Sequence, residues 1–206
     1  MIKTYIRENE SRLLENLFSL IRIPSISALP EHHDDMLKCA DRWKELLLAA
    51  GVDRAEVMPS DGNPLVYAEK LIPGADKTIL IYGHYDVMPV EPLELWKSDP
   101  FKPEVRDEHI WARGADDDKG QSFIQYAAFE FLVKHNLLRH NVKFILEGEE
   151  EIGSPSLETF LAQHRELLKS DIILVSDTSM LAADLPSLTT GLRGIAYWDV
   201  EVTGPN

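Results

Sequence analysis

The sequence contains little cysteine and has no long apolar run. Cys39 is its one cysteine among 206 residues, so the chain cannot form an internal disulfide, and this usage is typical of a reducing compartment. No segment approaches the ~18 consecutive apolar residues of a membrane-spanning helix, and the first residues lack the pattern of a signal peptide. We therefore expect a cytoplasmic protein that does not use a membrane as a partner.

Basic residues are the second shortage. The chain has 21 Lys and Arg against 35 Asp and Glu, which gives a formal net charge of -14. Nucleic acids and anionic membranes are bound through basic patches, so this balance argues against both as partners. Solubility alone accounts for most of the acidic residues. The acids that cluster in the sequence need a separate explanation.

The apolar pattern predicts alternating helices and strands. Helical spacing predicts helices over residues 2–22 and 34–50, one directly after Gly120, and one after Pro155 with Leu157, Phe160, Leu161 and Leu168 facing inward. Strands are predicted near residues 55–58, 65–68, 79–82, 142–146, 172–175 and 195–203, with a short hairpin between Glu104 and Ala112. This alternation indicates an α/β domain with a mostly parallel sheet flanked by helices. The order of the strands cannot be read from the sequence.

Two polar side chains follow directly after the apolar strand Ile79–Tyr82. His84 and Asp86 are two residues apart, so on an extended chain they face the same side. Open α/β sheets bind their ligands just beyond the carboxyl ends of the strands. We therefore expect His84 and Asp86 to act on one ligand at this edge.

Further acidic groups occur at comparable places. Glu149–Glu151 and Asp177 follow two other apolar strands, and Asp116–Asp118 precede a helix. Parallel strands present their carboxyl ends at one edge, so these groups converge there, where ionised carboxylates repel one another strongly. Bound divalent cations remove that repulsion. An imidazole with carboxylates suits zinc, or alternatively manganese or cobalt.

Each of these features also has an ordinary structural interpretation. His84 alone is typical of a hydrogen-bonded structural histidine, and an aspartate triplet can cap a helix and complement its dipole. A glutamate run is usually a solvated surface, and Asp177 can be a loop acid. Four such features at the ends of core elements favour a metal site.

The motifs that carry these residues resemble a known family. GHYDVMP, the spacing Trp96-x-x-x-Pro100-Phe101, ARGADDDKG and EGEEEIGS occur in one order between about residues 79 and 177. This series resembles the di-zinc exopeptidases that include carnosinase-type dipeptidases, aminoacylases and carboxypeptidase G-like enzymes, and most of all the dipeptidase branch. The resemblance implies a metal-dependent hydrolase that cleaves the amide bond of dipeptides or similar small amides. The alternatives are an N-acyl amino acid deacylase and a non-catalytic metal-binding or assembly relative.

The resemblance also implies residue roles at the first metal. His84 and Asp177 bind this metal, and Asp86 orients the His84 ring. The first acid of the D-x-K-G pattern bridges both metals, which selects Asp117. The peptide bond between Asp117 and Asp118 is expected to be cis.

The glutamate run supplies the base and the second metal. Glu150 is the expected general base, Glu151 the expected ligand of the second metal, and Glu149 an extra acid. Two metals lower the pKa of a water and polarise the scissile carbonyl, while Glu150 transfers the proton to the leaving amine. A structural site needs no base, so the presence of Glu150 argues against the non-catalytic alternative.

The domain organisation is likewise implied by the resemblance. Residues 1–190 are assigned to the N-terminal part of the catalytic domain, and residues 191–206 to the start of a lid or dimerisation domain. One more histidine ligand of the second metal and the substrate-holding histidine and arginine are expected beyond residue 206, and the full-length protein is expected to be a homodimer. Residues 1–206 alone are therefore expected to bind metal weakly and to turn over little or no substrate. The other histidines match no motif and are expected at surface or helical positions: His32, His33, His109, His135, His140 and His164.

Overall fold

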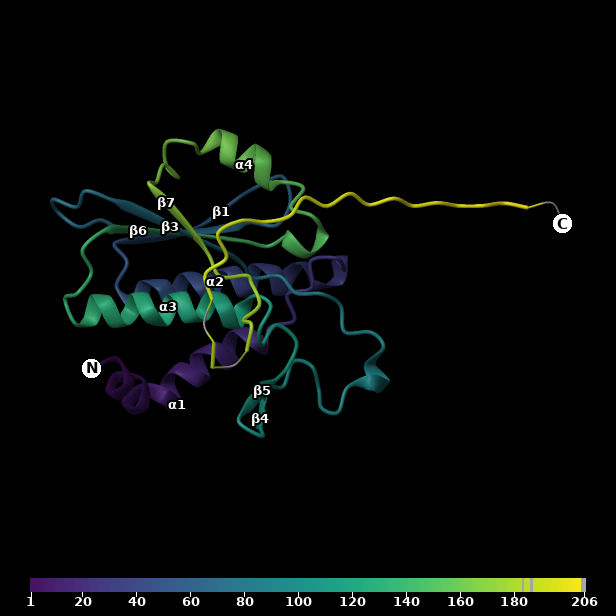
Figure 1. The fold of residues 1–206 in the computed structure, drawn as a ribbon, viewed down its shortest axis with the longest axis horizontal. Helices are drawn as coiled ribbons and strands as arrows, with labels where there is room; N and C mark the ends of the chain where they lie inside the picture. The colour runs from purple at the N-terminus through teal and green to yellow at the C-terminus, as the bar shows by residue number, and fades with distance from the viewer. Residues whose placement is uncertain (183, 186, 205–206) are drawn as a thin grey trace.

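The computed structural model describes residues 1–182, 184–185 and 187–204, which form helices around a central sheet (Figure 1). The helices are α1 (Ile2–Ile21), α2 (His33–Ala50), α3 (Lys119–Lys134) and α4 (Leu157–Gln163), with short 3-10 helices η1 (Pro30–His32), η2 (Leu93–Leu95) and η3 (Glu150–Ile152). The strands are β1 (Arg54–Met58), β2 (Leu65–Lys70), β3 (Thr78–His84), β4 (Glu104–Arg106), β5 (His109–Trp111), β6 (Asn141–Glu147) and β7 (Ile172–Val175). No helix in these described ranges has the length and hydropathy needed to span a membrane.

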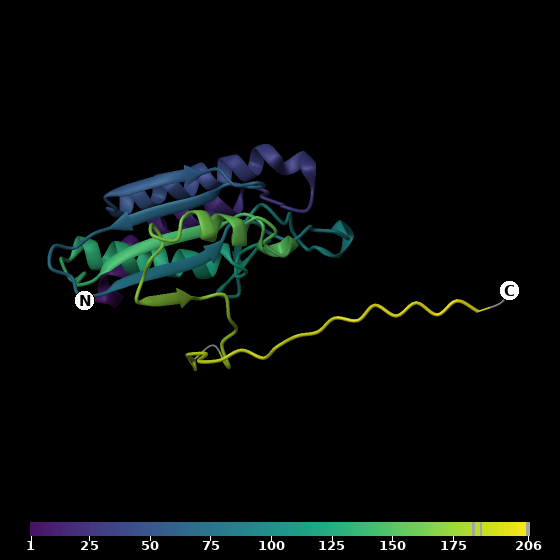
Figure 2. The same cartoon turned by 90° about the horizontal axis from the view of Figure 1, so that it is seen from above.

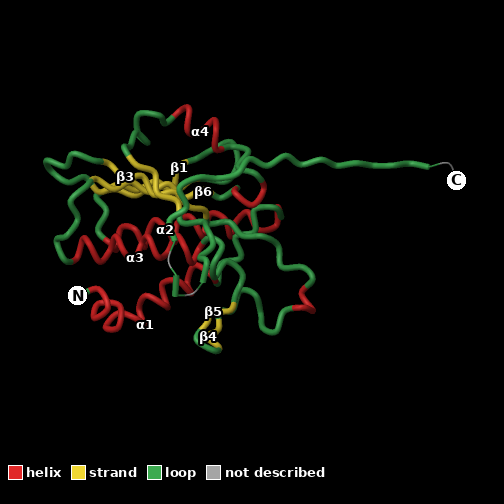
Figure 3. Tube along the Cα trace, viewed as in Figure 1, coloured by secondary structure: helices red, strands yellow, loops and turns green. Residues whose placement is uncertain are grey.

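The central sheet has the strand order β1-β2-β6-β3-β7. β3 runs parallel to both of its neighbours, β6 and β7, whereas β2 runs antiparallel to β1 and β6. Four strands of the central sheet therefore point the same way and only β2 is reversed, as the strand arrows in Figure 2 show. Figure 3 marks these strands in yellow between the helices, which are red. This confirms the predicted α/β class with a mostly parallel sheet. The predicted hairpin, β4 with β5, forms a separate two-stranded sheet.

Helices cover both faces of the sheet. α2 and α3 pack against one face, α1 packs on these two helices, and α4 lies on the opposite face (Figure 1). The alternation of side chains along β3 explains the two cores, since Ile81 enters the core under α2 and α3 and Leu80 enters the core under α4. The larger core therefore lies between the sheet and the helices α2 and α3, and α3 begins two residues after Asp117.

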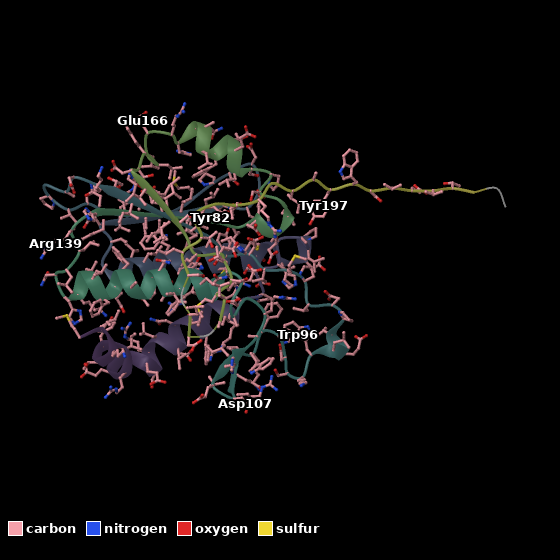
Figure 4. The ribbon with its side chains drawn as sticks, in the orientation of Figure 1. Tyr82, Trp96, Asp107, Arg139, Glu166 and Tyr197 are labelled. Carbon is pink, nitrogen blue, oxygen red and sulfur yellow. The ribbon has the colours of Figure 1, made fainter. Side chains whose placement is uncertain are left out.

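Two of the predictions about local structure are wrong. Residues 195–203 form no strand, and Tyr197 on this tail is 90% exposed and leads away from the sheet (Figure 4). Alternating apolar residues form a strand only where a neighbouring strand accepts their backbone hydrogen bonds, and no described strand lies beside this tail. Leu161 does not face inward but is 40% exposed, because the seven-residue α4 buries only Phe160. Leu168 is buried as expected, but it lies beyond the end of that helix.

Two adjacent leucines of α2 provide a matched test of the larger core. Leu47 is fully buried, whereas the neighbouring Leu48 is 46% exposed. Leu47→Ala is expected to lower the free energy of unfolding by about 2–5 kcal/mol because it leaves a cavity. Leu48→Ala is expected to change it by no more than about 0.5 kcal/mol. Urea unfolding of the two variants measures the difference, and equal losses would contradict this packing.

Candidate metal centre

The carboxyl ends of three parallel strands place the candidate site. His84 is the last residue of β3 and pairs in register with Glu147, the last residue of β6. Asp177 follows two residues after the end of β7. Asp117 lies just before the first turn of α3. Because these strands run in one direction, polar groups that follow them in sequence meet at one edge of the sheet.

The imidazole of His84 is surrounded by carboxylates. Its Nε2 atom lies 3.1 Å from Asp117 Oδ1, 3.7 Å from Asp177 Oδ2 and 3.9 Å from Glu150 Oε2. One potential ligand atom from each of His84, Asp117 and Asp177 falls within 4.8 Å of the others. The structure thus brings together the three residues that the sequence assigned to the first metal, with the predicted base beside them.

Asp86 contacts the His84 ring at Nδ1, the nitrogen that does not face Asp117, Asp177 and Glu150. Both side chains are fully buried, and His84 Nδ1 lies 3.2 Å from Asp86 Oδ1 and 3.1 Å from the Asp86 carbonyl oxygen. Nδ1 donates its proton toward these acceptors, and Nε2 faces Asp117 and Asp177. A metal bound at Nε2 would require a neutral ring with its proton on Nδ1, which is the tautomer that these acceptors favour.

The same carboxylate also fixes the backbone of the glutamate run. Asp86 Oδ1 accepts the N–H of Glu150 at 3.2 Å, and Asp86 Oδ2 accepts the N–H of Glu151 at 3.0 Å. Ser27 Oγ donates to Oδ2 at 2.6 Å. The sequence analysis did not identify Ser27, because no local signal reveals that the segment between the first two helices pairs with the segment after β3.

Asp118 is a second buried carboxylate that the sequence reasoning did not assign. Its Oδ2 accepts the backbone N–H of His84 at 3.0 Å and the hydroxyl of Ser122 at 2.6 Å, and the Asp117–Asp118 peptide bond is cis as expected. Gly83 makes room for this contact, since a Cβ there would lie 1.9 Å from Ser122 Oγ. Burial raises the pKa of Asp118 to about 6.

The electrostatics of the site favour a bound cation. Burial, followed by the charge of Asp117, raises the pKa of Glu151 to about 7, and burial together with neighbouring carboxylates also raises the pKa values of Glu150 and Asp177. Burial alone would lower the pKa of His84, but the bond to Asp86 and the nearby carboxylates raise it to about 10. A divalent cation would relieve this excess of negative charge, and the nitrogen and oxygen donors fit zinc, manganese or cobalt.

The three consecutive glutamates have different surroundings. Glu150 faces His84, whereas Glu151 Oε1 accepts the N–H of Met88 at 3.2 Å and lies outside the group formed by His84, Asp117 and Asp177. Glu149 is buried and bonds to segments away from the metal ligands. The predicted second-metal ligand is therefore close to the first group but separate from it.

An α/β sheet with a candidate metal centre at the carboxyl ends of its parallel strands is the class of domain observed, and comparison with known proteins defines its family. Residues 80–202 match the model of Peptidase family M20/M25/M40, which covers more than half of the chain. The chain belongs to this family. The match confirms the resemblance that the sequence motifs carry.

Relatives in the same family include dipeptidases. The chain is 31% identical to the Cysteinylglycine-S-conjugate dipeptidase of Corynebacterium striatum over 94% of this chain and 43% of that protein. It is 33% identical to the Beta-Ala-His dipeptidase of Rattus norvegicus over 96% of this chain and 43% of that protein. The M20 family metallo-carboxypeptidase Sso-CP2 from Sulfolobus solfataricus superimposes with a TM-score of 0.76 and 39% identity, over 82% of this chain and 38% of that one. The chain thus spans less than half the length of these relatives.

The raised pKa of Glu151 predicts a pH-dependent stability in the metal-free protein. Because the fold disfavours the ionised form, the folded state binds more protons than the unfolded state between about pH 4.5 and about pH 7. Stability of chelator-treated protein should therefore fall as the pH rises through this window. Glu151→Gln is expected to make that fall shallower.

The midpoint of thermal unfolding, measured across this pH window, checks the prediction. Glu158→Gln is the matched control, because Glu158 is exposed on α4. An unchanged slope in Glu151→Gln would show that this carboxylate is not destabilised in the fold.

Proposed function

We propose that this protein is a metal-dependent peptidase that hydrolyses dipeptides or similarly small amides with the help of two divalent ions, zinc above all. The observation that carries the proposal is the group formed by His84, Asp117 and Asp177, with the carboxylate of Glu150 3.9 Å from the same imidazole nitrogen. Membership of the peptidase family and the dipeptidase relatives support peptide substrates over other amides.

The proposed ligands divide between two ions. His84 and Asp177 would hold the first ion, Glu151 would hold the second, and Asp117 would serve as a ligand shared by the two. When bound, the ions would polarise the scissile carbonyl and lower the pKa of a water molecule. Asp86 keeps the His84 ring in the required tautomer and orientation through its contact with Nδ1.

Glu150 moves the proton in the proposed reaction. Its carboxylate takes a proton from the attacking water and delivers it to the leaving amine, so that one water is added across the amide bond and a carboxylate and an amine result. Burial raises the pKa of Glu150, which brings this side chain nearer to the neutral range in which a group both accepts and donates protons effectively. The hydrogen bond that the backbone N–H of Glu150 donates to Asp86 holds the backbone from which this side chain extends.

Hydrolysis of N-acyl amino acids is the alternative use of the same site. It needs the same metals and base, and differs only in what surrounds the substrate. The assignment of residues 191–206 to a lid domain, the homodimer and the cytoplasmic location stay predictions.

A substrate panel on the full-length protein tests the proposed function. We expect two divalent ions for each chain and dipeptide cleavage that a chelator abolishes and added zinc, manganese or cobalt restores. Faster cleavage of N-acetyl amino acids than of dipeptides would favour the deacylase alternative. If the protein retains no metal and cleaves nothing after metal is added, the proposal is wrong.

Replacement of the proposed base separates catalysis from metal binding. Glu150→Gln keeps the size of the side chain but removes its ability to take a proton, and it is expected to lower kcat by about 10²- to 10⁴-fold. Metal content should stay at the wild-type value, because Glu150 is not a proposed ligand. Steady-state kinetics and elemental analysis measure both effects, and a wild-type rate in this variant would refute the role of Glu150.

A further inference from the structure

Glu149, the first of the three consecutive glutamates, points away from the metal ligands and into the protein. It is only 6% exposed. Its Oε1 accepts the backbone N–H of Asn63 at 2.9 Å, and its Oε2 accepts the backbone N–H of Ser156 at 3.1 Å. One carboxylate thus joins the turn between β1 and β2 to the start of α4.

These bonds surround η3, the short helix that carries Glu150 and Glu151. The carbonyl oxygen of Glu149 also accepts the N–H groups of Ile152 and Ser154, at 3.2 and 2.8 Å. These two bonds hold the backbone at the end of η3 against its start. From the metal side, Asp86 holds the N–H groups of Glu150 and Glu151. The segment is therefore held between two buried carboxylates, one on each side.

The β1–β2 turn is shaped to receive Glu149. Ser60 Oγ accepts the N–H of Gly62 and donates to the carbonyl of Asn63, and Asn63 Nδ2 donates to the carbonyl of Gly148 at 3.0 Å. A Cβ at Gly62 would lie 1.8 Å from Glu149 Oε1, so any larger residue displaces the carboxylate. The turn and the glutamate fit each other although 86 residues separate Asn63 from Glu149.

We propose that Glu149 is a positioning residue for hydrolysis, which holds the β1–β2 turn, η3 and the start of α4 together so that Glu150 stays in place beside His84. This inference rests on the proposed role of Glu150 as the base. The turn at residues 60–64 contributes none of the proposed metal ligands. Under this proposal it nevertheless influences turnover through its contact with Glu149.

The two hydrogen bonds explain why a carboxylate is needed at position 149. Both oxygens of Glu149 accept a buried or half-buried backbone N–H, and a glutamine offers one acceptor oxygen and one NH₂ group that can only donate. Glu149→Gln therefore leaves one N–H without its partner and moves one end of the segment. A displacement of about 1 Å in a catalytic group can lower the rate by about 10²-fold.

A double-mutant cycle on the full-length protein, saturated with metal, tests the proposal. Glu149→Gln and Gly62→Ala are each expected to lower kcat for a cleaved dipeptide by about 10- to 100-fold, with KM changed by less than about two-fold. The double variant should be no slower than the slower single variant, because both changes break the same contact. Glu158→Gln, on the exposed face of α4, is the control and should keep the wild-type rate.

The outcomes separate positioning from stability. A wild-type kcat in folded Glu149→Gln, or kcat losses that multiply in the double variant, would overturn the proposal. If Glu149→Gln does not fold, Gly62→Ala takes its place, since the added Cβ displaces the Glu149 carboxylate and leaves the glutamate itself in the chain. A wild-type kcat in folded Gly62→Ala would equally overturn the proposal.

The role of Glu150 is tested independently. A wild-type rate in Glu150→Gln would remove the basis of the proposed function while the coupling between Gly62 and Glu149 could still be measured. Conversely, a slow Glu150→Gln variant with a fully active Glu149→Gln variant would refute only the positioning role.

Discussion

The crowding of carboxylates around one buried imidazole is the constraint on which the rest of the site depends. His84 Nε2 lies within 3.9 Å of oxygen atoms from Asp117, Asp177 and Glu150. This crowding follows from the parallel arrangement of β3 and β7, because the side chains that follow these strands emerge at the same edge of the sheet. Such a concentration of negative charge is stable only when protons or cations are bound, and this requirement links the fold to metal chemistry.

A second group of acids lies outside the proposed metal ligands and holds the backbone that carries them. Asp118 accepts the N–H of His84, Asp86 accepts the N–H groups of Glu150 and Glu151, and Glu149 fastens the far side of the same segment. Carboxylates that accept backbone N–H groups in a buried environment are strong and directional partners. The acidic motifs therefore contain both the reactive groups and the groups that position them.

Particular residues show how far prediction from sequence reaches. The strands that end at His84 and Glu147, the helix that follows Asp118 and the convergence of His84, Asp117 and Asp177 were all predictable, because periodicity and position along a strand are local properties. The strand expected at residues 195–203 was not found, since an alternating pattern needs a partner strand that the pattern itself does not contain. Leu161 was misassigned because α4 is too short to bury a full face.

The sequence by itself determined the class of fold, the family and the residues that converge on the candidate site, because each of these depends on short motifs and on their order along the chain. The tertiary structure alone decided the strand order, the reversal of β2, and the partners of Glu149 and Ser27. Those contacts join segments up to 86 residues apart. No local pattern encodes them, since they arise only when packing of the two cores brings the turn between β1 and β2 against the glutamate run.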